Sequence, residues 1–436
     1  MKRFLAVGAA FVILGGIFFL LADSHDISID SGLSLEVRGS NSVDSTPAED
    51  ISSSESKKEE APKPASQTNV VGSSDIEIQS KLPSPPSVVK AAYLTGWSAG
   101  SKNKIAETIS LANRTELNAV VIDIKDYSGY VSYAMNVPEV RASGALDQLR
   151  ILRPNALIKA LHDANIYVIG RVSVFQDPIL AQAHPEWAIK NETTGKLWVD
   201  RKGLAWMDAA AEPVWDYNIA IAKDALSRGF DEINFDYVRF PSDGDMSVTS
   251  YPFWDEVSAR RATMRKFFSY VREKLPNDVI SADLFGLATI NRDDLGIGQV
   301  IEDAYRYFDY ICPMIYPSHY AAGFLGYKNP AANPYEVIKY SMERAIARLY
   351  PAPSAINASS SPQPTSTAPI FTARLRPWLQ DFNLGATYTA EMVRKQIDAV
   401  EEVTKNAPTE GQFTGWLLWD PSNTYTEGAL RLGEVL

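Results

Sequence analysis

Residues 119–126 read Ala119-Val120-Val121-Ile122-Asp123-Ile124-Lys125-Asp126, and this stretch decides the fold class. Its first four residues are apolar on both alternating faces, and its charged residues come only toward the C-terminal end. A strand that is apolar on both faces fits a parallel sheet that is covered on both sides. The stretch therefore predicts a buried parallel strand with polar side chains at its C-terminal end.

Seven further stretches in residues 89–436 share this character and alternate with longer helical patterns. The predicted strands are 92–97, 119–126, 167–175, 232–240, 279–287, 309–316, 370–378 and 415–419. The predicted helices include 156–164, 213–228, 254–274, 299–308, 335–350 and 390–406. Eight β/α repeats of this length predict an α/β protein with the (β/α)8 TIM-barrel fold. An open doubly wound sheet is the alternative, but no glycine-rich phosphate turn follows the first strand.

The N-terminal 22 residues predict a membrane anchor. Lys2 and Arg3 precede an uncharged apolar run, residues 4–22, which is long enough to span a bilayer. Leu20 and Leu21 stand where a cleavage site would need small residues, so an uncleaved signal anchor is favoured over a cleaved, secreted form. Since basic residues stay on the cytoplasmic side, we expect a single pass through the cytoplasmic membrane with the rest of the chain outside.

Two stretches lack the composition of a folded core. Residues 23–88 contain no aromatic residue and are crowded with Ser, Pro, Glu and Lys, which predicts a disordered linker. Residues 351–369 are rich in Pro and Ser without any charge, which predicts a disordered insertion. Because this insertion follows a helix and precedes a strand, it belongs on the face of a barrel opposite to the active site. The barrel domain is therefore predicted to span residues 89–436.

Composition excludes several classes of function. The chain has one cysteine and four histidines, and none of them stands at a metal-ligand spacing, so we expect no metal site. No phosphate-binding loop or other cofactor motif is present, so we expect no cofactor. The formal net charge is −11 without a basic run, which argues against nucleic acid as a partner.

Polar residues two positions apart share one face of a strand, because side chains alternate. Four predicted strands carry such pairs near their C-terminal ends: Asp123 with Lys125, Arg171 with Ser173, Asn234 with Asp236, and Ser281 with Asp283. Inward polar groups at this end of a barrel mark its active face. One interpretation is a structural ion network that pairs Asp123 with Lys125 and Asp236 with Arg171. A catalytic carboxylate pair tuned by basic groups is the favoured interpretation.

Tryptophans are expected around the same face. Trp97, Trp378, Trp416 and Trp419 fall on the first, seventh and eighth predicted strands, and Trp187, Trp198 and Trp206 fall in the long loop after the third. Any single tryptophan can be core packing, but several at one barrel mouth provide flat apolar platforms on which sugar rings stack. Carboxylates with aromatic platforms, and without a nucleophile elbow, point to a glycoside substrate.

Longer motifs at these residues resemble a known family, the extracytoplasmic bacterial TIM barrels of unknown function that are classed as glycoside hydrolase-like. The matching stretches are 121–126, 177–187, 229–241, 313–320 and 376–382, and the two longest of them are specific. A very close match is the segment Gly229-Phe230-Asp231-Glu232-Ile233-Asn234-Phe235-Asp236-Tyr237-Val238-Arg239-Phe240-Pro241. The resemblance runs from about residue 92 to residue 420. It departs at residues 207–210 and at the 351–369 insertion. It implies a barrel glycosidase that acts on an extracellular or cell-envelope polysaccharide.

The roles we expect follow from these positions. Asp236 is the expected nucleophile or charge-stabilising carboxylate, Asp283 the expected general acid, and Asp123 the substitute for either. The residues expected to contact substrate are Lys125, Arg171, Arg239, Tyr316, His319, Trp97, Trp187, Trp378 and Trp419. Arg239 faces away from Asp236 by strand alternation, which makes its direct role the weakest of these. A catalytically silent carbohydrate-binding barrel and an envelope scaffold for protein partners are the alternatives.

Overall fold

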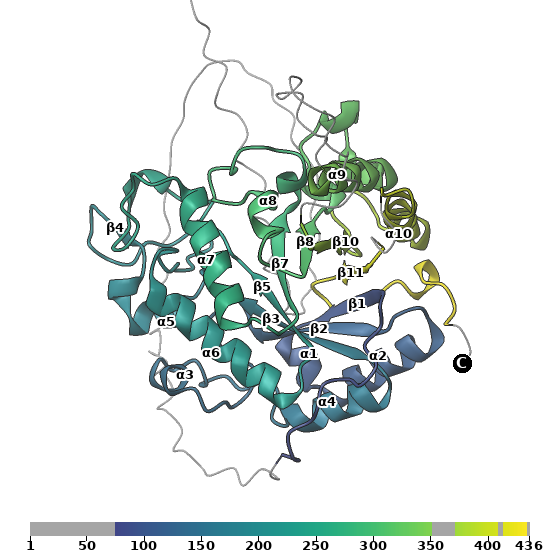
Figure 1. Ribbon diagram of the computed structural model, residues 1–436, viewed down its shortest axis with the longest axis horizontal. Helices are drawn as coiled ribbons and strands as arrows, with labels where there is room; N and C mark the ends of the chain where they lie inside the picture. The colour runs from purple at the N-terminus through teal and green to yellow at the C-terminus, as the bar shows by residue number, and fades with distance from the viewer. Residues whose placement is uncertain (1–74, 351–370, 409–412, 434–436) are drawn as a thin grey trace, which may run out of the picture. The chain divides into compact units, whose positions relative to one another are not determined.

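The sheet of this protein is parallel and closes on itself (Figure 1). The computed structural model describes residues 75–350, 371–408 and 413–433. The strands of the sheet are β1 (Val89–Leu94), β2 (Ala119–Lys125), β3 (Tyr167–Ser173), β5 (Glu232–Asp236), β7 (Ile280–Phe285), β8 (Tyr310–Met314), β9 (Arg374–Leu375), β10 (Trp378–Gln380) and β11 (Gly415–Trp419). They follow in the order β10-β11-β1-β2-β3-β5-β7-β8-β9, and β10 also pairs with β8. The predicted barrel is confirmed.

The seventh position of the barrel is shared by β9 and β10. Residues 376 and 377 separate the two strands, and Pro377 has no N–H to donate to a neighbouring strand. β9 pairs with the start of β8, whereas β10 pairs with Met314 at the end of β8 and along β11. The single strand expected over residues 370–378 is therefore two short strands that together close the barrel.

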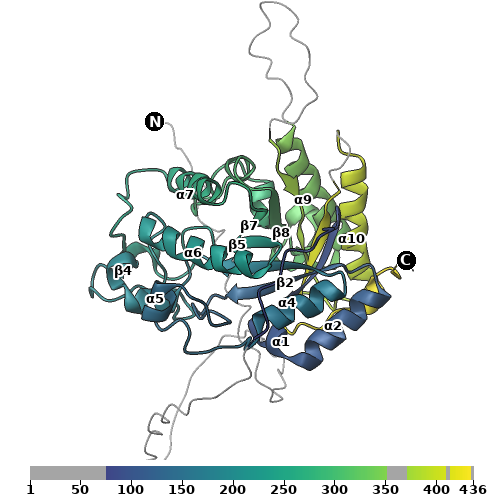
Figure 2. The ribbon, with the colours of Figure 1, turned by 60° about the horizontal axis from the view of Figure 1, so that its bottom comes forward.

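Helices connect successive strands and cover the outside of the sheet. They are α1 (Gly96–Gly100), α2 (Lys102–Arg114), α3 (Pro138–Ala142), α4 (Pro154–Asp163), α5 (Pro178–Ala183), α6 (Glu212–Arg228), α7 (Arg260–Lys274), α8 (Ile301–Ala304), α9 (Pro334–Leu349) and α10 (Ala390–Lys405). α9 and α10 pack side by side (Figure 2). Proline begins or nearly begins α4, α6 and α9, where its missing N–H leaves no bond unmade. The helix expected over residues 254–274 begins only at Arg260, and that expected over residues 299–308 is a single turn.

The first strand lies three residues earlier than the pattern predicts. It ends at Leu94, after which Thr95 accepts a hydrogen bond from the Ser98 amide and caps the N-terminus of α1. Trp97 consequently lies on α1 and does not end a strand. Its side chain is 61% exposed. The expectation that Trp97 ends β1 is wrong, although α1 still lies on the C-terminal side of the barrel.

The described chain begins before the barrel. Asp75 accepts hydrogen bonds from the backbone amide of Asn155 (2.8 Å) at the start of α4. Leu82 is buried, and its amide donates to Asp231 (2.6 Å) before β5. The domain boundary expected at residue 88 is therefore too late, because residues 75–88 pack against the N-terminal ends of the repeats.

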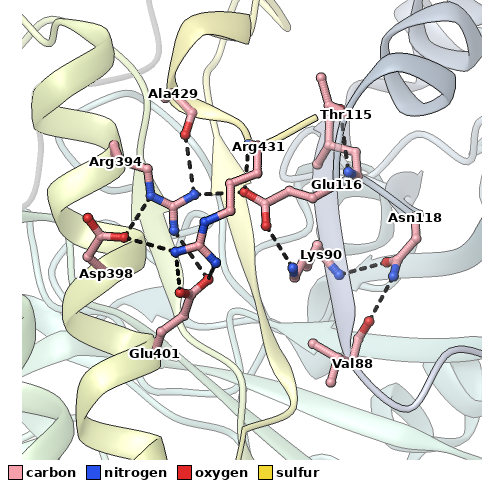
Figure 3. A network of polar contacts seen from close by, with 11 residues as sticks. Val88, Lys90, Thr115, Glu116, Asn118, Arg394, Asp398, Glu401, Ala429 and Arg431 are labelled. Carbon is pink, nitrogen blue, oxygen red and sulfur yellow. Dashed lines mark hydrogen bonds and ion pairs between the residues drawn. The ribbon is translucent and has the colours of Figure 1, made fainter. Parts of the chain in front are cut away.

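A polar network joins the first and last repeats (Figure 3). Glu116, just before β2, accepts hydrogen bonds from Lys90 Nζ (2.7 Å), Arg394 Nη1 (2.7 Å) and the Arg431 amide (3.0 Å). Asn118 in turn accepts from the Lys90 amide (2.8 Å). The C-terminal segment and α10 are thus fastened to the N-terminal ends of β1 and β2.

Several expectations concern residues that the structure does not describe. Within residues 75–350, 371–408 and 413–433, no helix is long and apolar enough to cross a membrane. The expected signal anchor of residues 1–22, most of the expected linker, and the whole of the 351–369 insertion lie outside these ranges.

Candidate active site

One guanidinium group joins three carboxyl groups inside the C-terminal end of the barrel. Arg171 of β3 donates from Nη1 to Asp123 Oδ1 of β2 (2.6 Å). Its Nε and Nη2 atoms donate to Asp236 Oδ2 of β5, with Nε at 3.1 Å. Asp283 Oδ2 of β7 lies 3.7 Å from the same Nε atom. The expected pairing of Asp236 with Arg171 is present, and Arg171 is also the partner of Asp123.

Strand register brings these four residues together. Asp123 stands directly beside Arg171 between β2 and β3, and Arg171 stands beside Asn234 between β3 and β5. Asp236 is two residues beyond Asn234 on the same face, and Asp283 has the corresponding position on β7, two residues beyond Ser281. The three carboxyl groups and Arg171 therefore come from four consecutive strands and meet inside the C-terminal end of the barrel.

Burial changes the acidity of two of the three carboxyl groups. The pKa of Asp123 is raised to about 6, chiefly by burial, and the Arg171 charge opposes this rise. The pKa of Asp283 is raised well above its ordinary value, first by burial and then by the negative charge of Asp236. One guanidinium cannot neutralise three carboxylates, and this shortage of positive charge favours the protonated form of Asp283.

Asp283 is held by neutral donors on one of its two oxygens. Its Oδ1 atom accepts hydrogen bonds from Trp378 Nε1 (2.7 Å) and Asn234 Nδ2 (2.9 Å). Its Oδ2 atom is buried without a hydrogen-bond partner among the described residues. Because Oδ1 is occupied by donors, the proton of the neutral acid belongs on Oδ2, the oxygen nearer to Arg171.

Asp236 is the most exposed of the three carboxyl groups, with a side chain that is 7% accessible. Its Oδ1 atom accepts a hydrogen bond from the Tyr237 amide (2.5 Å), and its Oδ2 atom accepts from Arg171. Tyr237 has a φ angle of 53°, so the backbone turns sharply where β5 ends. A guanidinium and a backbone amide therefore donate to both oxygens of Asp236 and fix the orientation of its side chain.

Lys125 does not join the carboxylate cluster. The pairing of β2 with β3 shifts register between Asp123 and Lys125, and this bulge breaks the alternation of side chains. Lys125 Nζ binds Asp177 Oδ2 (2.5 Å) and lies 5.2 Å from the ring of Tyr217 on α6. Burial lowers its pKa, and Asp177 opposes the change. The pair of Asp123 with Lys125 in the ion-network interpretation is therefore wrong, and Lys125 is fully buried beside Asp177.

Arg239 also lies elsewhere than expected. β5 ends at Asp236, so strand alternation no longer applies three residues later. The Arg239 guanidinium carbon lies 4.6 Å from the ring of Phe285, the last residue of β7, and 4.7 Å from the ring of Trp206. It thus sits at the C-terminal ends of β5 and β7, beside the carboxylate cluster.

The expected tryptophan platforms divide into buried and exposed groups. Trp378 is completely buried inside the barrel, where its indole Nε1 donates to Asp283. Trp419 stacks on Tyr93 with ring centroids 3.9 Å apart, and Arg171 lies 5.1 Å from its ring. Trp198, Trp206 and Trp416 are also buried. Trp97 is the exposed ring, with the Arg150 guanidinium 5.4 Å away.

The remaining predicted contact residues lie on two neighbouring loops. Tyr316 and His319 follow β8, with ring centroids 5.2 Å apart. Burial raises the pKa of Tyr316, and the nearby charges of Asp283 and Asp236 raise this pKa further. His319 is exposed. Trp187 is half-buried and stacks on His184 at 3.8 Å, in the loop after β3.

The strand pattern places Asn234 and Ser281 on the face of the site without giving them a role, and it misses Tyr93. The Tyr93 hydroxyl donates to Asp123 Oδ2 (2.5 Å), and Asn234 and Ser281 connect the cluster to deeper layers of the barrel. The only sequence signal for Asn234 and Ser281 is that polar residues interrupt apolar strands. Tyr93 gives no such signal, because tyrosine is common in strands.

The three carboxyl groups are largely covered in this conformation. Two surface pockets lie away from these carboxyl groups, one between α9 and α10 and one on the outer face of α7. Within the described residues, no group of three or more His, Cys, Asp or Glu side chains is arranged to hold a metal ion. What the cluster offers chemically is a buried carboxyl group with a raised pKa, Asp283, beside a second carboxyl group, Asp236, that Arg171 holds.

Comparisons with known proteins agree with this chemistry. A family model described as "putative glycosyl hydrolase domain" matches residues 91–425. A hypothetical protein from Ruminiclostridium thermocellum is 41% identical, over 47% of this chain and 98% of that chain, with a TM-score of 0.41.

Two solved enzyme structures are more distantly similar. An alpha-galactosidase from Thermus thermophilus is 13% identical, over 79% of this chain and 60% of that chain, with a TM-score of 0.46. Alpha-L-fucosidase isoenzyme 2 from Paenibacillus thiaminolyticus is 14% identical, over 78% of this chain and 48% of that chain, with a TM-score of 0.47. The chain thus spans less than two thirds of either enzyme. No curated protein matches the chain.

Proposed function

The chain belongs to this family of glycosyl hydrolase domains, and from that premise we propose that its barrel hydrolyses glycosidic bonds in an extracellular or cell-envelope polysaccharide. The observation that carries the proposal is the cluster in which Arg171 contacts Asp236 and approaches Asp283. Glycoside hydrolysis needs an ionised carboxylate and a protonated carboxyl group on either side of one bond. Asp236 and Asp283 supply these two states from neighbouring strands.

Asp236 acts as the nucleophile in this proposal. It is the most accessible carboxyl group of the three, and Arg171 and the Tyr237 amide both donate hydrogen bonds to it. Its free electron pair attacks the anomeric carbon as the bond to the leaving oxygen breaks. A water molecule then displaces Asp236 from the glycosyl-enzyme intermediate and releases the sugar.

Asp283 acts as the general acid. The proton on Oδ2 passes to the leaving oxygen, and the resulting carboxylate later takes a proton from the attacking water. Because the Asp283 side chain is only 1% exposed, the side chains that cover it must move when a sugar binds. Asp123, with a pKa raised to about 6, remains the substitute for this role.

The geometry supports retention of anomeric configuration. The Oδ2 atoms of Asp236 and Asp283 lie 3.1 and 3.7 Å from the same nitrogen of Arg171, so they are no more than about 6.8 Å apart. Retaining glycosidases hold their carboxyl groups roughly 5–5.5 Å apart, whereas inverting enzymes need about 6.5–9.5 Å for the attacking water. Nearly all Oδ2–Oδ2 distances that this limit allows are shorter than the separation of about 6.5 Å that inverting enzymes need.

We also propose that the barrel works outside the cell while residues 4–22 hold the chain in the cytoplasmic membrane. The support is the uncharged apolar run that follows Lys2 and Arg3. Such an arrangement places an envelope polysaccharide within reach of the barrel.

Asp236→Asn tests the proposal, because it removes the charge with almost no change in volume. Turnover of a responsive polysaccharide, measured as new reducing ends, should fall by at least about a thousandfold while the fold survives. Asp283→Asn should slow poor leaving groups and spare activated aryl glycosides, which need no proton donor. Asp293→Asn, on an exposed loop, is the matched control.

The same variants separate the alternatives. A catalytically silent barrel that only binds carbohydrate has no turnover to lose. The exposed ring of Trp97 could bind a sugar in such a barrel as well. If Asp236→Asn keeps its turnover while Asp123→Asn loses it, the two carboxyl groups have exchanged roles and the assignment above is refuted. Proton NMR of the first-formed anomer tests the prediction of retention.

A further inference from the structure

Arg239 is a nearly buried cation beside the carboxylate cluster. Its side chain leaves β5 just after the turn at Tyr237 and is 8% exposed. The guanidinium lies between the rings of Trp206 and Phe285, at 4.7 and 4.6 Å. Rings at these distances stabilise a cation and hold its plane in one orientation.

The hydrogen bonds of Arg239 leave one edge of the guanidinium open. Nη1 donates to the Phe240 carbonyl oxygen (3.1 Å) and to Ser242 Oγ (3.1 Å), which uses both of its hydrogens. Nε and Nη2 have no acceptor among the described residues. These two nitrogen atoms are also absent from the set of fully buried polar atoms without a hydrogen-bond partner, so they are not fully buried. The Nε–Nη2 edge, with two parallel N–H groups, therefore reaches the surface of the described structure.

Other buried basic residues show what is missing. Six basic side chains are buried in the described part of the chain, and five of them form ion pairs with carboxyl groups: Lys125 with Asp177, Arg150 with Asp126, Arg171 with Asp123 and Asp236, Arg348 with Glu302, and Arg376 with Glu232. Arg239 has no carboxylate within 4.0 Å in the same residues. Buried charges are almost never left unpaired, because their desolvation cost is large.

The carboxyl groups near Arg239 do not fill this gap. Asp236, Asp243 and Asp200 act on it only at longer range, as the charges that oppose the lowering of its pKa by burial. Asp200 accepts hydrogen bonds from Gln176 and Trp206 on one oxygen and from backbone amides on the other. Asp236 is bound to Arg171. No described carboxyl group lies within 4.0 Å of Arg239, so the open edge is available to an acceptor from outside the described chain.

We propose that Arg239 binds the carboxylate of an acidic sugar, so that the substrate is a polysaccharide that contains uronic acid or another carboxylated residue. The inference rests on the proposed function and deepens it by naming the substrate class. A planar carboxylate accepts both parallel N–H groups of a guanidinium edge, which a single hydroxyl group of a neutral sugar cannot do. Arg239 lies at the ends of β5 and β7, so the carboxylate would sit on a sugar next to the bond that is cleaved.

Chemically matched polymers test this inference. Polygalacturonate and alginate are each compared with the same polymer after reduction of its carboxylates to hydroxymethyl groups. Binding to the full chain in detergent micelles is measured by calorimetry, and cleavage is measured as reducing ends. We expect the wild-type chain to prefer the carboxylated member of at least one pair by about 10- to 100-fold, the range of a hydrogen bond to a charged group.

Two substitutions connect the preference to Arg239. Arg239→Gln should abolish the preference, because it should weaken binding of the carboxylated polymer by more than binding of the reduced polymer. Arg239→Lys should keep only part of the preference, because lysine keeps the charge and loses the paired N–H groups. Arg374→Gln is the matched control, since Arg374 is exposed at the start of β9, at the opposite end of the barrel. Thermal unfolding of each variant verifies that the fold is kept.

The outcomes distinguish this inference from the proposed function. Equal binding of carboxylated and reduced polymers by the wild-type chain overturns the inference even if the neutral polymers are cleaved. A preference that survives Arg239→Gln, or dextran sulfate binding as tightly as the carboxylated polymers, also overturns it, because each indicates general charge attraction. A carboxylate preference that depends on Arg239 without any cleavage supports the site and refutes the hydrolase.

Discussion

Asp123→Asn should make the protein more stable at neutral pH. Asp123 is a buried carboxyl group whose pKa is raised to about 6 from an ordinary value of 3.8. Asparagine resembles the protonated acid in shape and charge, since its Oδ1 can accept from Arg171 and its Nδ2 can donate to the Tyr93 hydroxyl. The substitution thus fixes the position in its neutral form at every pH.

The size of the effect follows from proton linkage. Because the folded pKa of Asp123 lies above the unfolded value, the folded protein binds the proton more tightly than the unfolded chain. The favourable contribution of the protonated group is fully present below about pH 4 and is lost as pH rises through about 6. A difference of about two pKa units, at roughly 1.4 kcal/mol each, amounts to about 3 kcal/mol.

Urea unfolding monitored by tryptophan fluorescence between pH 4 and pH 8 measures this contribution. The difference in unfolding free energy between Asp123→Asn and the wild type should be near zero at pH 4 and rise to about 3 kcal/mol in favour of the variant above pH 7. Taking the difference cancels the other groups that titrate in this range. Asp293→Asn, an exposed position, should change the free energy by less than about 0.5 kcal/mol.

The opposite sign would refute the reasoning. Suppose that Asp123→Asn is less stable than the wild type at pH 7 and that the difference in unfolding free energy shrinks on acidification. The pKa of Asp123 in the folded protein would then lie below its ordinary value. Arg171 would then outweigh burial, and the cluster would be a structural ion network. If the difference does not change with pH, Asp123 does not titrate between pH 4 and pH 8 in the folded protein.

Two further predictions concern the fold and the topology. Gly415→Ala should destabilise the barrel by more than about 3 kcal/mol, because Gly415 has a φ of 101° and an added Cβ would lie 1.7 Å from the Val89 carbonyl oxygen. The loss should appear as a lower thermal midpoint. An unchanged midpoint would show that β1 and β11 can separate at no cost. Protease added to spheroplasts should release a fragment cut between residues 23 and 74, since residues 75–88 pack on the barrel, and recovery of the barrel in the cytosol would refute the proposed anchor.

The barrel could be predicted because each of its strands is an apolar run with a clear end. Within β2, residues 119–122 are buried on both faces, as their sequence requires. The errors lie at the edges of the runs. β1 includes Lys90, whose charged end reaches Glu116 while its backbone stays in the sheet, so the strand begins before the apolar pattern does.

The sequence also predicts which carboxyl groups point into the barrel near its C-terminal end, because side chains alternate inside regular strands. Asp236 and Asp283 face the interior, as expected from their spacing to Asn234 and Ser281. Alternation fails at irregular backbone, which sequence does not reveal. Arg239 follows a turn and Trp378 follows the break at Pro377, so neither side chain could be placed by counting residues.

The bulge in β2 has the largest chemical consequence. Regular alternation would have placed Lys125 beside Asp123, giving three carboxyl groups two cations and leaving little reason for any of them to be protonated. The bulge instead sends Lys125 to Asp177, and Arg171 alone serves Asp123, Asp236 and Asp283. The resulting deficit of positive charge is what allows burial to raise the pKa of Asp283. A cluster built for stability would gain from a second cation, whereas a cluster that must hold a proton at neutral pH requires its absence.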